Sequence, residues 1–524
     1  MPRRAAGRRA SRARRVRGLR RTGSMGRRAA ARSWKHRKPP HALDARTTVE
    51  ADRDGKCPMS DSDADRMGAF DAVMWGIEDD PLLRSVIVAL VTLETEPDRQ
   101  RLTERVERLT RVVPQLRQSV IGNPVSLIPP RWETDPHFDL DYHLRWIALP
   151  AGENGLHGVL RLAEITAEQD FDRDRPLWEM TVATGLSDGG AAIIMKLHHA
   201  IADGVGGMML AATMFDLTPE GADLGPMPDA PQPRPSLDPL QRLSAGIDYE
   251  VTESRGLLQS AVGSGVDVLR RVVTDPAGSL QATTEFALSA SRLLAPASTP
   301  LSPIMTERSL DVRCALLHTP LASLKAAGKQ SGGTLNDAFM AIVARGLRSY
   351  HAAMGAEVDA LRVNMPVNMR KGDDAAVRGN AWVPARFALP LGGRTATDTM
   401  RDLHPVLLAA RTEPALPVST VVYRLLCTLP NPVATVIAGG LMKGTDVAAT
   451  NVPGPPFPIY VAGAKASRIV PFAPKGGASL NVALMTYDGS AYFGITMDPA
   501  AVTDPDLLVG SIAAAIHEVT DTDA

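Results

Sequence analysis

A proline-rich segment constrains most strongly how this chain can fold. Seven prolines lie between residues 217 and 240, a density that excludes a helix interior or a central strand there. On both sides of it, short apolar runs typical of strands alternate with amphipathic runs typical of helices. The pattern predicts two α/β halves joined by a long crossover linker. At 524 residues, the chain is long enough for more than one hydrophobic core.

Before the prolines, residues 85–94 read as a buried strand. An amphipathic helix follows, in which Leu102, Val106 and Leu109 share one face. Two further strand-like runs, LWEMTVATG and AAIIMKLHH, are separated by the turn sequence SDGG. We therefore expect these two runs to form a hairpin.

After the prolines, residues 241–295 look helical. The run TLNDAFMAIVARGLRSYH predicts an amphipathic helix that Asn336 or Asp337 caps. LRVNMPVNMR predicts a strand ending in a polar loop, and Asp488-Gly489 predicts the turn of a second hairpin.

These features divide the chain into four parts. We predict a basic disordered arm over residues 1–62, an N-terminal half over 63–216, a linker with crossover helices over 217–302 and a C-terminal half over 303–520.

The basic arm explains how the chain reaches a formal net charge of zero. Its first 43 residues hold 14 Arg, 2 Lys and no acidic residue, so the remainder is acidic. This composition predicts a solvated tail. Binding to anionic lipid is the alternative. Nucleic acid is not expected as a partner, because no binding motif or interleaved aromatic residue accompanies the charge.

The stretch LHHAIADGVGG, residues 197–207, places polar groups directly after an apolar strand-like run. We expect His199 at the end of that strand and Asp203 near the start of the next helix. A neutral imidazole with a pKa of about 6.5 can accept a proton at cellular pH. The competing interpretations are a structural histidine and a metal ligand. Since no second cluster of ligand residues has suitable spacing, we expect no metal.

A serine nucleophile is disfavoured. GLSDG matches the G-x-S-x-G string of serine hydrolases, but that mechanism needs a strand, a sharp turn and then a helix. Here a strand-like run follows, which puts Ser187 in the hairpin turn. A histidine base would then have to activate a hydroxyl or amine of the substrate itself.

HHAIADG resembles the H-H-x-x-x-D-G motif of the bacterial wax ester synthase/diacylglycerol acyltransferase family, which belongs to the CoA-dependent acyltransferases with the chloramphenicol acetyltransferase fold. Further stretches agree in order, namely DRPLWEM, TLNDAFMAIVARGLR, MPVNMR and TNVPGPPFPIYVAGAKA. The resemblance runs from about Met67 to the C-terminus. Thr450, where serine is commoner, departs from the pattern and bears on substrate preference.

The resemblance implies the architecture and a role for each matching residue. It implies an α/β fold (two-layer α+β) of two chloramphenicol acetyltransferase-like halves with the site in a tunnel between them. His199 would be the general base, and His198 is the first histidine of the motif. Asp203 would hold the loop through an arginine, for which Arg370 is the candidate. Gly204 would let the backbone turn beside the substrate. The residues expected near substrate are Pro176, Leu177, Trp178, Asn336 and Asn451.

We therefore expect an O-acyltransferase that moves a long-chain acyl group from acyl-CoA to diacylglycerol, giving triacylglycerol, or to a long-chain alcohol, giving a wax ester. Acyl-CoA is a substrate, so no cofactor is expected. One alternative is transfer to another lipid alcohol, such as a polyketide-type diol. A non-catalytic lipid-binding homologue is the other, and the intact motif argues against it because a carrier needs no base.

The cysteines and the hydrophobic runs bear on location. The cysteines, which lack disulfide or metal spacing, are Cys57, Cys314 and Cys427. This usage fits a reducing cytoplasm. No apolar run reaches the roughly 18 residues of a membrane span. The nearest, residues 418–442, is interrupted by Arg424 and two prolines, which predicts core helices or, alternatively, a membrane-touching surface. We expect a cytoplasmic protein that is peripheral on the inner face of the plasma membrane or on lipid inclusions.

Overall fold

The computed structural model describes residues 66–122, 129–201, 213–232, 241, 244, 299–368, 382–413, 416–427 and 429–521. The chain divides into the units Met1–Pro58 and Met59–Ala524, and the described residues belong to the second. The basic arm and nearly all of the predicted helical region 241–295 lie outside the described residues.

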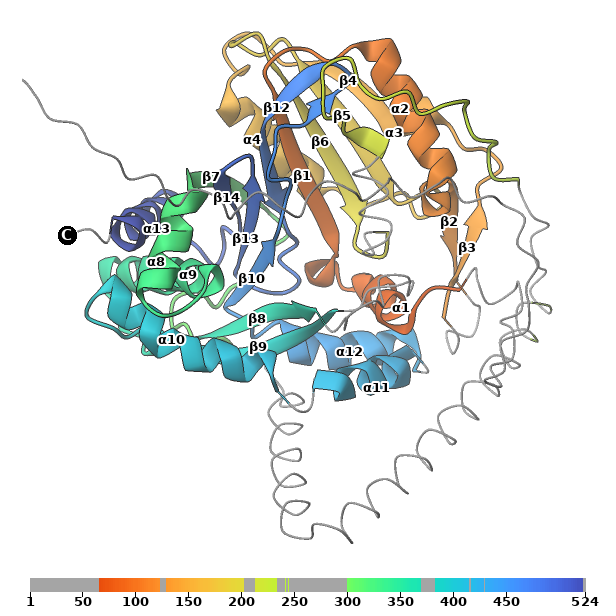
Figure 1. Cartoon of the computed structure of the whole chain (residues 1–524). Coiled ribbons are helices and arrows are strands. Elements are labelled where there is room, and N and C mark those ends of the chain that lie inside the picture. Colours follow the sequence, from red (N-terminus) through yellow and green to blue (C-terminus); the bar gives the residue numbers. More distant parts are fainter. Residues whose placement is uncertain are drawn as a thin grey trace, which may run out of the picture. The chain divides into compact units, whose positions relative to one another are not determined.

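Within these residues, the N-terminal half is built on a six-stranded mixed sheet with the order β11-β12-β1-β6-β5-β4 (Figure 1). Its strands are β1 (Val86–Leu93), β4 (Leu144–Ala148), β5 (Trp178–Thr184), β6 (Ala191–His198), β11 (Tyr460–Val461) and β12 (Ala464–Phe472). Helix α4 (Leu156–Glu168) packs on β1 and β6. The predicted helix is confirmed as α2 (Arg99–Val112), and its apolar face joins the core of the sheet.

Shorter elements surround this sheet. They are α1 (Ala69–Gly76), the 3-10 turns η1 (Ile77–Asp79), η2 (Pro81–Leu83) and η3 (Pro114–Arg117), helix α3 (Leu140–His143), and the paired strands β2 (Gln118–Ile121) and β3 (Arg131–Thr134).

The C-terminal half has its own six-stranded sheet in the described residues, with the order β7-β14-β13-β10-β8-β9. Its strands are β7 (Arg313–Pro320), β8 (Ala360–Asn368), β9 (Trp382–Pro390), β10 (Val447–Val452), β13 (Leu480–Tyr487) and β14 (Ser490–Met497). Its helices are α8 (Leu321–Gln330), α9 (Leu335–Ala353), α10 (Ala396–Arg411), α11 (Leu416–Cys427), α12 (Asn431–Met442) and α13 (Pro505–Thr520). Helix α9 is central, since it contacts α8, α10 and α13.

Two strands cross from one half to the other. β11 and β12 lie within the range predicted for the C-terminal half, yet they complete the N-terminal sheet. β12 pairs antiparallel with β1, from Val88 opposite Phe472 to Leu93 opposite Ala466. In Figure 1 the blue β12 accordingly lies beside the red-orange β1. The boundary at residue 303 therefore does not separate the two sheets, because strand pairing joins segments far apart in the sequence.

The two sheets approach each other closely at Gly494 of β14. A Cβ atom at this position would lie 1.8 Å from the carbonyl oxygen of Pro471 in β12. No side chain can occupy that space, so the contact between the sheets requires glycine.

The first part of the proline-rich linker is held by arginines on one face of α2. Their guanidinium groups donate to linker carbonyls: Arg101 to Pro219 at 2.6 Å, Arg105 to Ala222 at 3.3 Å, Arg108 to Leu224 at 3.1 Å and Arg111 to Pro228 at 2.8 Å. Arg101 and Arg105 also bind the buried carboxylate of Asp216. Because proline has no backbone N–H, the linker cannot form regular backbone hydrogen bonds, and the arginine side chains donate to these carbonyls instead.

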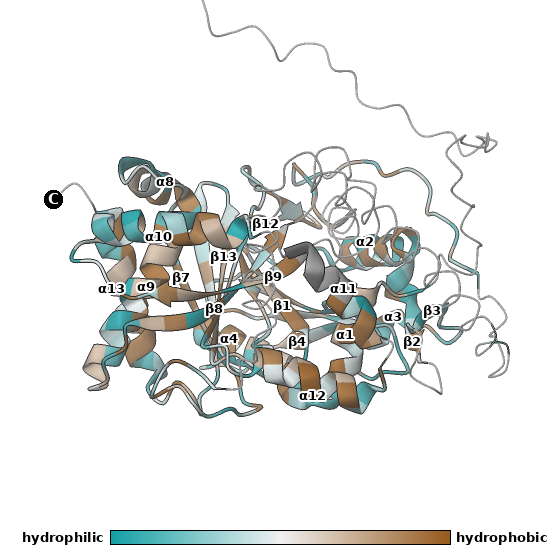
Figure 2. Ribbon diagram, turned by 90° about the horizontal axis from the view of Figure 1, so that it is seen from below, coloured by the Kyte–Doolittle hydropathy of each residue, from teal (hydrophilic) through white to brown (hydrophobic). Residues whose placement is uncertain are grey.

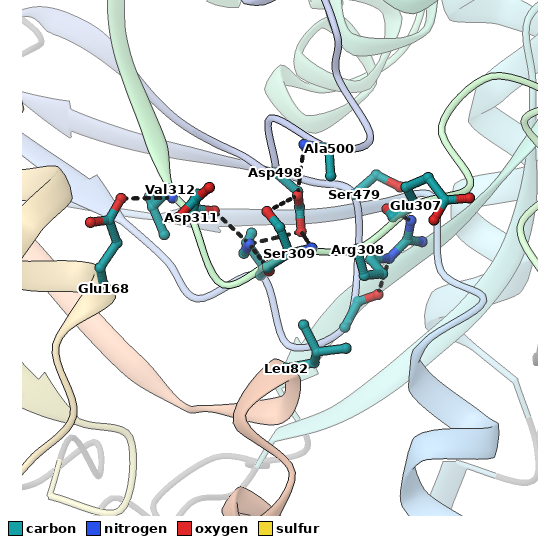
Figure 3. A network of polar contacts seen from close by, with 12 residues as sticks. Leu82, Glu168, Glu307, Arg308, Ser309, Asp311, Val312, Ser479, Asp498 and Ala500 are labelled. Atoms are coloured by element: carbon teal, nitrogen blue, oxygen red, sulfur yellow. Dashed lines mark hydrogen bonds and ion pairs between the residues drawn. The ribbon is translucent and has the colours of Figure 1, made fainter.

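A second polar junction joins the halves where β7 begins (Figure 3). The carboxylate of Glu168, at the end of α4, accepts from the backbone N–H of Val312 at 3.0 Å. Beside it, Lys475 donates at 2.8 Å to Asp498 and to the carbonyl oxygens of Ser309 and Asp311. The entry into β7 is thus fixed from both halves.

Two predicted hairpins are confirmed, and one predicted helix cap is wrong. β5 pairs antiparallel with β6, and β13 with β14. Asp488 and Gly489 both have positive φ, at 43° and 79°, as a two-residue hairpin turn requires. Helix α9 is capped by Thr334 instead of Asn336 or Asp337. Asp337 completes a capping box with Thr334, because its position three residues later lets its carboxylate reach back to the N-cap.

Replacing Gly494 with alanine should destabilise the protein strongly. The new methyl group would overlap the Pro471 carbonyl, and relieving such a clash costs about 1–3 kcal/mol or more. Thermal unfolding of Gly494→Ala should therefore occur several degrees below wild type. Gly510→Ala is the matched control, since Gly510 lies in α13 with open space around it, and there alanine should stabilise slightly. Equal melting temperatures for Gly494→Ala and wild type would contradict the close approach.

Candidate active site

The two adjacent histidines lie where β6 ends, as predicted. β6 finishes at His198, and residues 199–201 form a turn. The backbone N–H of His198 donates to the carbonyl of Leu177 and that of His199 to the carbonyl of Ser85, both at 3.0 Å. The N–H of Ile201 returns to the His198 carbonyl at 3.0 Å. These bonds hold the backbone of His199 between the segments that flank β5 and β1.

His198 is fully buried, and its two ring nitrogens have distinct partners. Nδ1 accepts from the backbone N–H of Ala200 at 3.1 Å, so Nδ1 carries no proton. Nε2 is then the protonated nitrogen and donates to Oε1 of Glu78 at 3.0 Å. One imidazole therefore connects the turn after β6 to the turn η1.

Glu78 is a buried carboxylate that binds both strand ends. Its Oε1 also accepts from the backbone N–H of Ser85 at 2.6 Å, and Ser85 is the residue whose carbonyl receives the His199 N–H. Its Oε2 lies 3.5 Å from the guanidinium of Arg173, which stacks on the ring of Trp75 at 4.3 Å. A buried carboxylate is costly unless donors surround it, and here three donors do so.

His199 is half-buried, and its ring lies edge-on to Phe70 at 6.1 Å. Burial, with a smaller contribution from neighbouring His198, lowers its pKa from 6.5 to about 4. The imidazole is therefore neutral at cellular pH, which is the form that can accept a proton.

An apolar pocket lies beyond Phe70. Phe70 packs edge-on against Tyr423 of α11, with ring centroids 4.8 Å apart. Tyr423 is one wall of a pocket between α1, α11, α12, β8 and β9. The lining residues are Val73, Met74, Ile77, Asn364, Pro384, Arg386, Val422, Tyr423, Leu426, Ala438, Leu441 and Met442. Because α1 belongs to the N-terminal half and the other elements to the C-terminal half, both halves form the pocket.

Other predicted substrate residues have buried or peripheral positions. Pro176, Leu177 and Trp178 are buried; the Trp178 indole donates to the Leu116 carbonyl at 2.8 Å and stacks on His143 at 4.7 Å. The Asn336 amide lies 3.8 Å from the sulfur of Met365.

The remaining predicted residues lie on strand β10, in the β5–β6 turn or outside the described residues. Asn451 is exposed on β10. Ser187 lies in the β5–β6 turn, as predicted. Asp203, Gly204 and Arg370 lie outside the described residues.

Sequence reasoning missed the residues that surround the histidines. Glu78 is the first of three consecutive acidic residues, and no spacing rule distinguishes it from its neighbours. Phe70 and Tyr423 are about 350 positions apart in the sequence, so only the packing of α11 on α1 reveals their contact.

Metal sites and membrane spans were sought among the described residues. There, no cluster of three or more His, Cys, Asp or Glu side chains could hold a metal ion. In the same residues, no helix has the length and hydrophobicity that crossing a membrane requires.

Two family models match the chain, the wax ester synthase/diacylglycerol acyltransferase catalytic domain over residues 67–339 and the C-terminal domain of the same family over residues 379–520. The chain belongs to this acyltransferase family. A Mycobacterium tuberculosis (strain H37Rv) protein named as a diacylglycerol O-acyltransferase is 34% identical over 457 residues, which cover 87% of this chain and 92% of the relative. A second so named from that strain is 27% identical, over 82% of this chain and 90% of the relative. The resemblance predicted from the motifs is confirmed.

Solved structures agree on the fold. The wax ester synthase/diacylglycerol acyltransferase from Marinobacter aquaeolei VT8 matches with a TM-score of 0.58 at 20% identity, covering 87% of this chain and 99% of that chain. The starter condensation domain of rhizomide synthetase matches with a TM-score of 0.53 at 12% identity, over 87% of this chain and 93% of that chain. The predicted α/β fold of the CoA-dependent acyltransferases is therefore confirmed.

Replacing Glu78 with glutamine should lower turnover by displacing the histidine turn. The amide keeps the shape of the side chain but loses the charge that His198, Ser85 and Arg173 share. A displacement of up to about 1 Å at a catalytic group can cost about a hundredfold in rate, so we expect kcat to fall tenfold to a hundredfold with KM nearly unchanged.

Glu179→Gln is the control for this experiment. Glu179 is a buried carboxylate on β5 that accepts from the Arg145 guanidinium at 3.0 Å. Glu179→Gln should be destabilised about as much as Glu78→Gln, but it should keep the wild-type turnover per folded molecule. Equal kcat in the two variants would show that the Glu78–His198 pair does not position the site.

Proposed function

We propose that this enzyme transfers a long-chain acyl group from acyl-CoA to diacylglycerol, with long-chain alcohols as further acceptors, and that His199 is the general base. The supporting observation is a neutral imidazole, on a backbone held by hydrogen bonds at a strand end, that the Phe70 ring separates from an apolar pocket formed by both halves. The names of the relatives support diacylglycerol as the acceptor.

The proposed reaction proceeds through the substrate's own hydroxyl. His199 takes the hydroxyl proton as the oxygen attacks the thioester carbonyl carbon. The carbon–oxygen bond of the new ester forms, the carbon–sulfur bond breaks, and the electron pair leaves on the CoA sulfur. The thiolate then takes this proton from His199, so the products are the ester and free CoA. Because the pKa of a thiol is about 8.5, the leaving group needs little acid assistance.

The other motif residues have supporting roles in this proposal. His198 positions the turn through Glu78, while Asp203 and Arg370 hold the loop after it and Gly204 allows the backbone to pass close to the substrate. Asn336, Asn451 and the segment Pro176, Leu177 and Trp178 shape the substrate channel. The pocket behind Phe70 takes an aliphatic chain of the acceptor, since most of its lining is apolar.

The lipid acceptor also determines where the enzyme works. Diacylglycerol and triacylglycerol reside in membranes and lipid inclusions, whereas acyl-CoA is dissolved in the cytoplasm. We place the enzyme in the cytoplasm, peripherally on the inner face of the plasma membrane or on lipid inclusions.

His199→Ala should lower turnover by about 10²–10⁴, the usual contribution of a general base. The assay uses labelled palmitoyl-CoA with dioleoylglycerol, hexadecanol and a long-chain diol, and identifies the esters formed. Ser187→Ala is the control and should keep wild-type turnover. Turnover of folded His199→Ala within about threefold of wild type would exclude the histidine as base, since a base contributes far more than that.

The pH dependence follows from the lowered pKa of His199. A base with a pKa near 4 stays neutral from pH 8 down to about pH 5.5, so kcat/KM should be flat over this range. A histidine with an ordinary pKa of about 6.5 would instead lose roughly tenfold by pH 5.5. A tenfold fall across this range in stable protein would contradict the burial of His199.

Filling the pocket should change the preference for chain length. Ala438 of α12 is buried and lines the pocket, so phenylalanine there would occupy space meant for an aliphatic chain. Each CH₂ group excluded forfeits about 0.8 kcal/mol of transfer free energy, so kcat/KM for dioleoylglycerol should fall about tenfold more than for dibutyrylglycerol. An equal fall for both acceptors, at unchanged melting temperature, would mean that the chain binds elsewhere.

A further inference from the structure

Helix α12 has an apolar outer face. The twelve residues Asn431–Met442 include no charged side chain. Val433, Val436 and Ile437 are exposed to 46%, 76% and 41%, and their spacing of three and four residues puts them on one side of the helix. Leu425 of neighbouring α11 is 62% exposed. Brown segments recur along α12 at the periphery of Figure 2. A surface helix normally presents polar residues outward, so this face marks an interaction site.

Another side of α12 lines the pocket behind Phe70. Ala438, Leu441 and Met442 form part of its wall, and Ala438 directly follows the exposed Ile437. From that pocket, Tyr423 contacts Phe70 and Phe70 contacts His199. Apolar surface thus continues from the outside of the molecule to the candidate base.

We propose that the α12 face, defined as Val433, Val436 and Ile437, docks on a lipid surface, and that diacylglycerol passes from this surface beside α12 into the pocket. The inference rests on the proposed function, because an enzyme with a lipid acceptor must reach that acceptor at a lipid surface. On docking, the aliphatic side chains enter the outer hydrocarbon region, about 5–10 Å deep, and α12 lies parallel to the surface.

A lipid surface fits this face better than a second copy of the chain does. A stable protein interface buries about 800 Å² per partner and has aromatic or arginine side chains at its centre. The α12 face has three small aliphatic side chains and neither of these residue types. A hydrocarbon phase needs no such specific partners, and it is also where the water-insoluble acceptor is found.

The test compares Val436→Asp with wild type in the full chain. Binding is measured by co-sedimentation with neutral phosphatidylcholine vesicles that contain dioleoylglycerol, at about 1 M salt, where the Debye length of about 3 Å suppresses attraction by the basic arm. Replacing an inserted valine with a charge should weaken binding about tenfold or more. Val436→Leu should bind at least as well as wild type.

Leu217→Asp is the matched control, since Leu217 is 68% exposed and lies in the linker held by α2. It should bind vesicles as wild type does. Acyl transfer to vesicle dioleoylglycerol should fall with binding in Val436→Asp, whereas transfer to monomeric dibutyrylglycerol should be unchanged.

Equal vesicle binding by Val436→Asp and wild type would overturn the docking surface. The docking surface would also be overturned if wild type formed a dimer that Val436→Asp dissociates and wild type did not bind vesicles. Failure of the proposed function is a separate result: no ester would form from any acceptor, while the difference in vesicle binding would persist and still support docking.

Discussion

The antiparallel pairing of β12 with β1 is the contact on which the rest of the structure depends. It inserts a C-terminal strand into the N-terminal sheet, so the N-terminal sheet is incomplete without the C-terminal half. It also places β1 between two partners, with β12 on one side and β6 on the other. Since β6 ends at the histidines and Ser85 directly precedes β1, the register of these strands determines where the candidate base lies.

A small network of buried hydrogen bonds holds these strand ends in place around the candidate site. Glu78 receives hydrogen bonds from both strand ends, through Ser85 on one side and His198 on the other. Burying a carboxylate and an imidazole together is favourable only when their donors and acceptors match, and here each atom has a defined partner. Both ring nitrogens of His198, the first histidine of the motif, are engaged in hydrogen bonds. The second histidine, His199, is half-buried and faces Phe70. Adjacent identical side chains therefore have different environments, and their expected roles differ accordingly.

The helices α11 and α12 connect this rigid site to the surface. In sequence they lie between β9 and β10 of the C-terminal sheet, but they form a separate apolar cluster with α1 of the N-terminal half. One side of the pair lines the pocket, and the other carries exposed aliphatic residues. The sequence left two interpretations of residues 418–442, core helices or a membrane-touching surface. Different faces of the same helices fit each of them.

The sequence by itself determined the local elements, because their signals lie within a few residues. Periodicity predicted β1 and α2, the Asp488-Gly489 turn predicted the β13–β14 hairpin, and the spacing within HHAIADG indicated the family. Only the tertiary structure decided which segments meet. Periodicity identifies a strand but not its partner, so the insertion of β12 beside β1 had no local signal. The same holds for Glu78 beside His198 and for Tyr423 beside Phe70, because burial and pairing between distant residues emerge only once the two halves pack together.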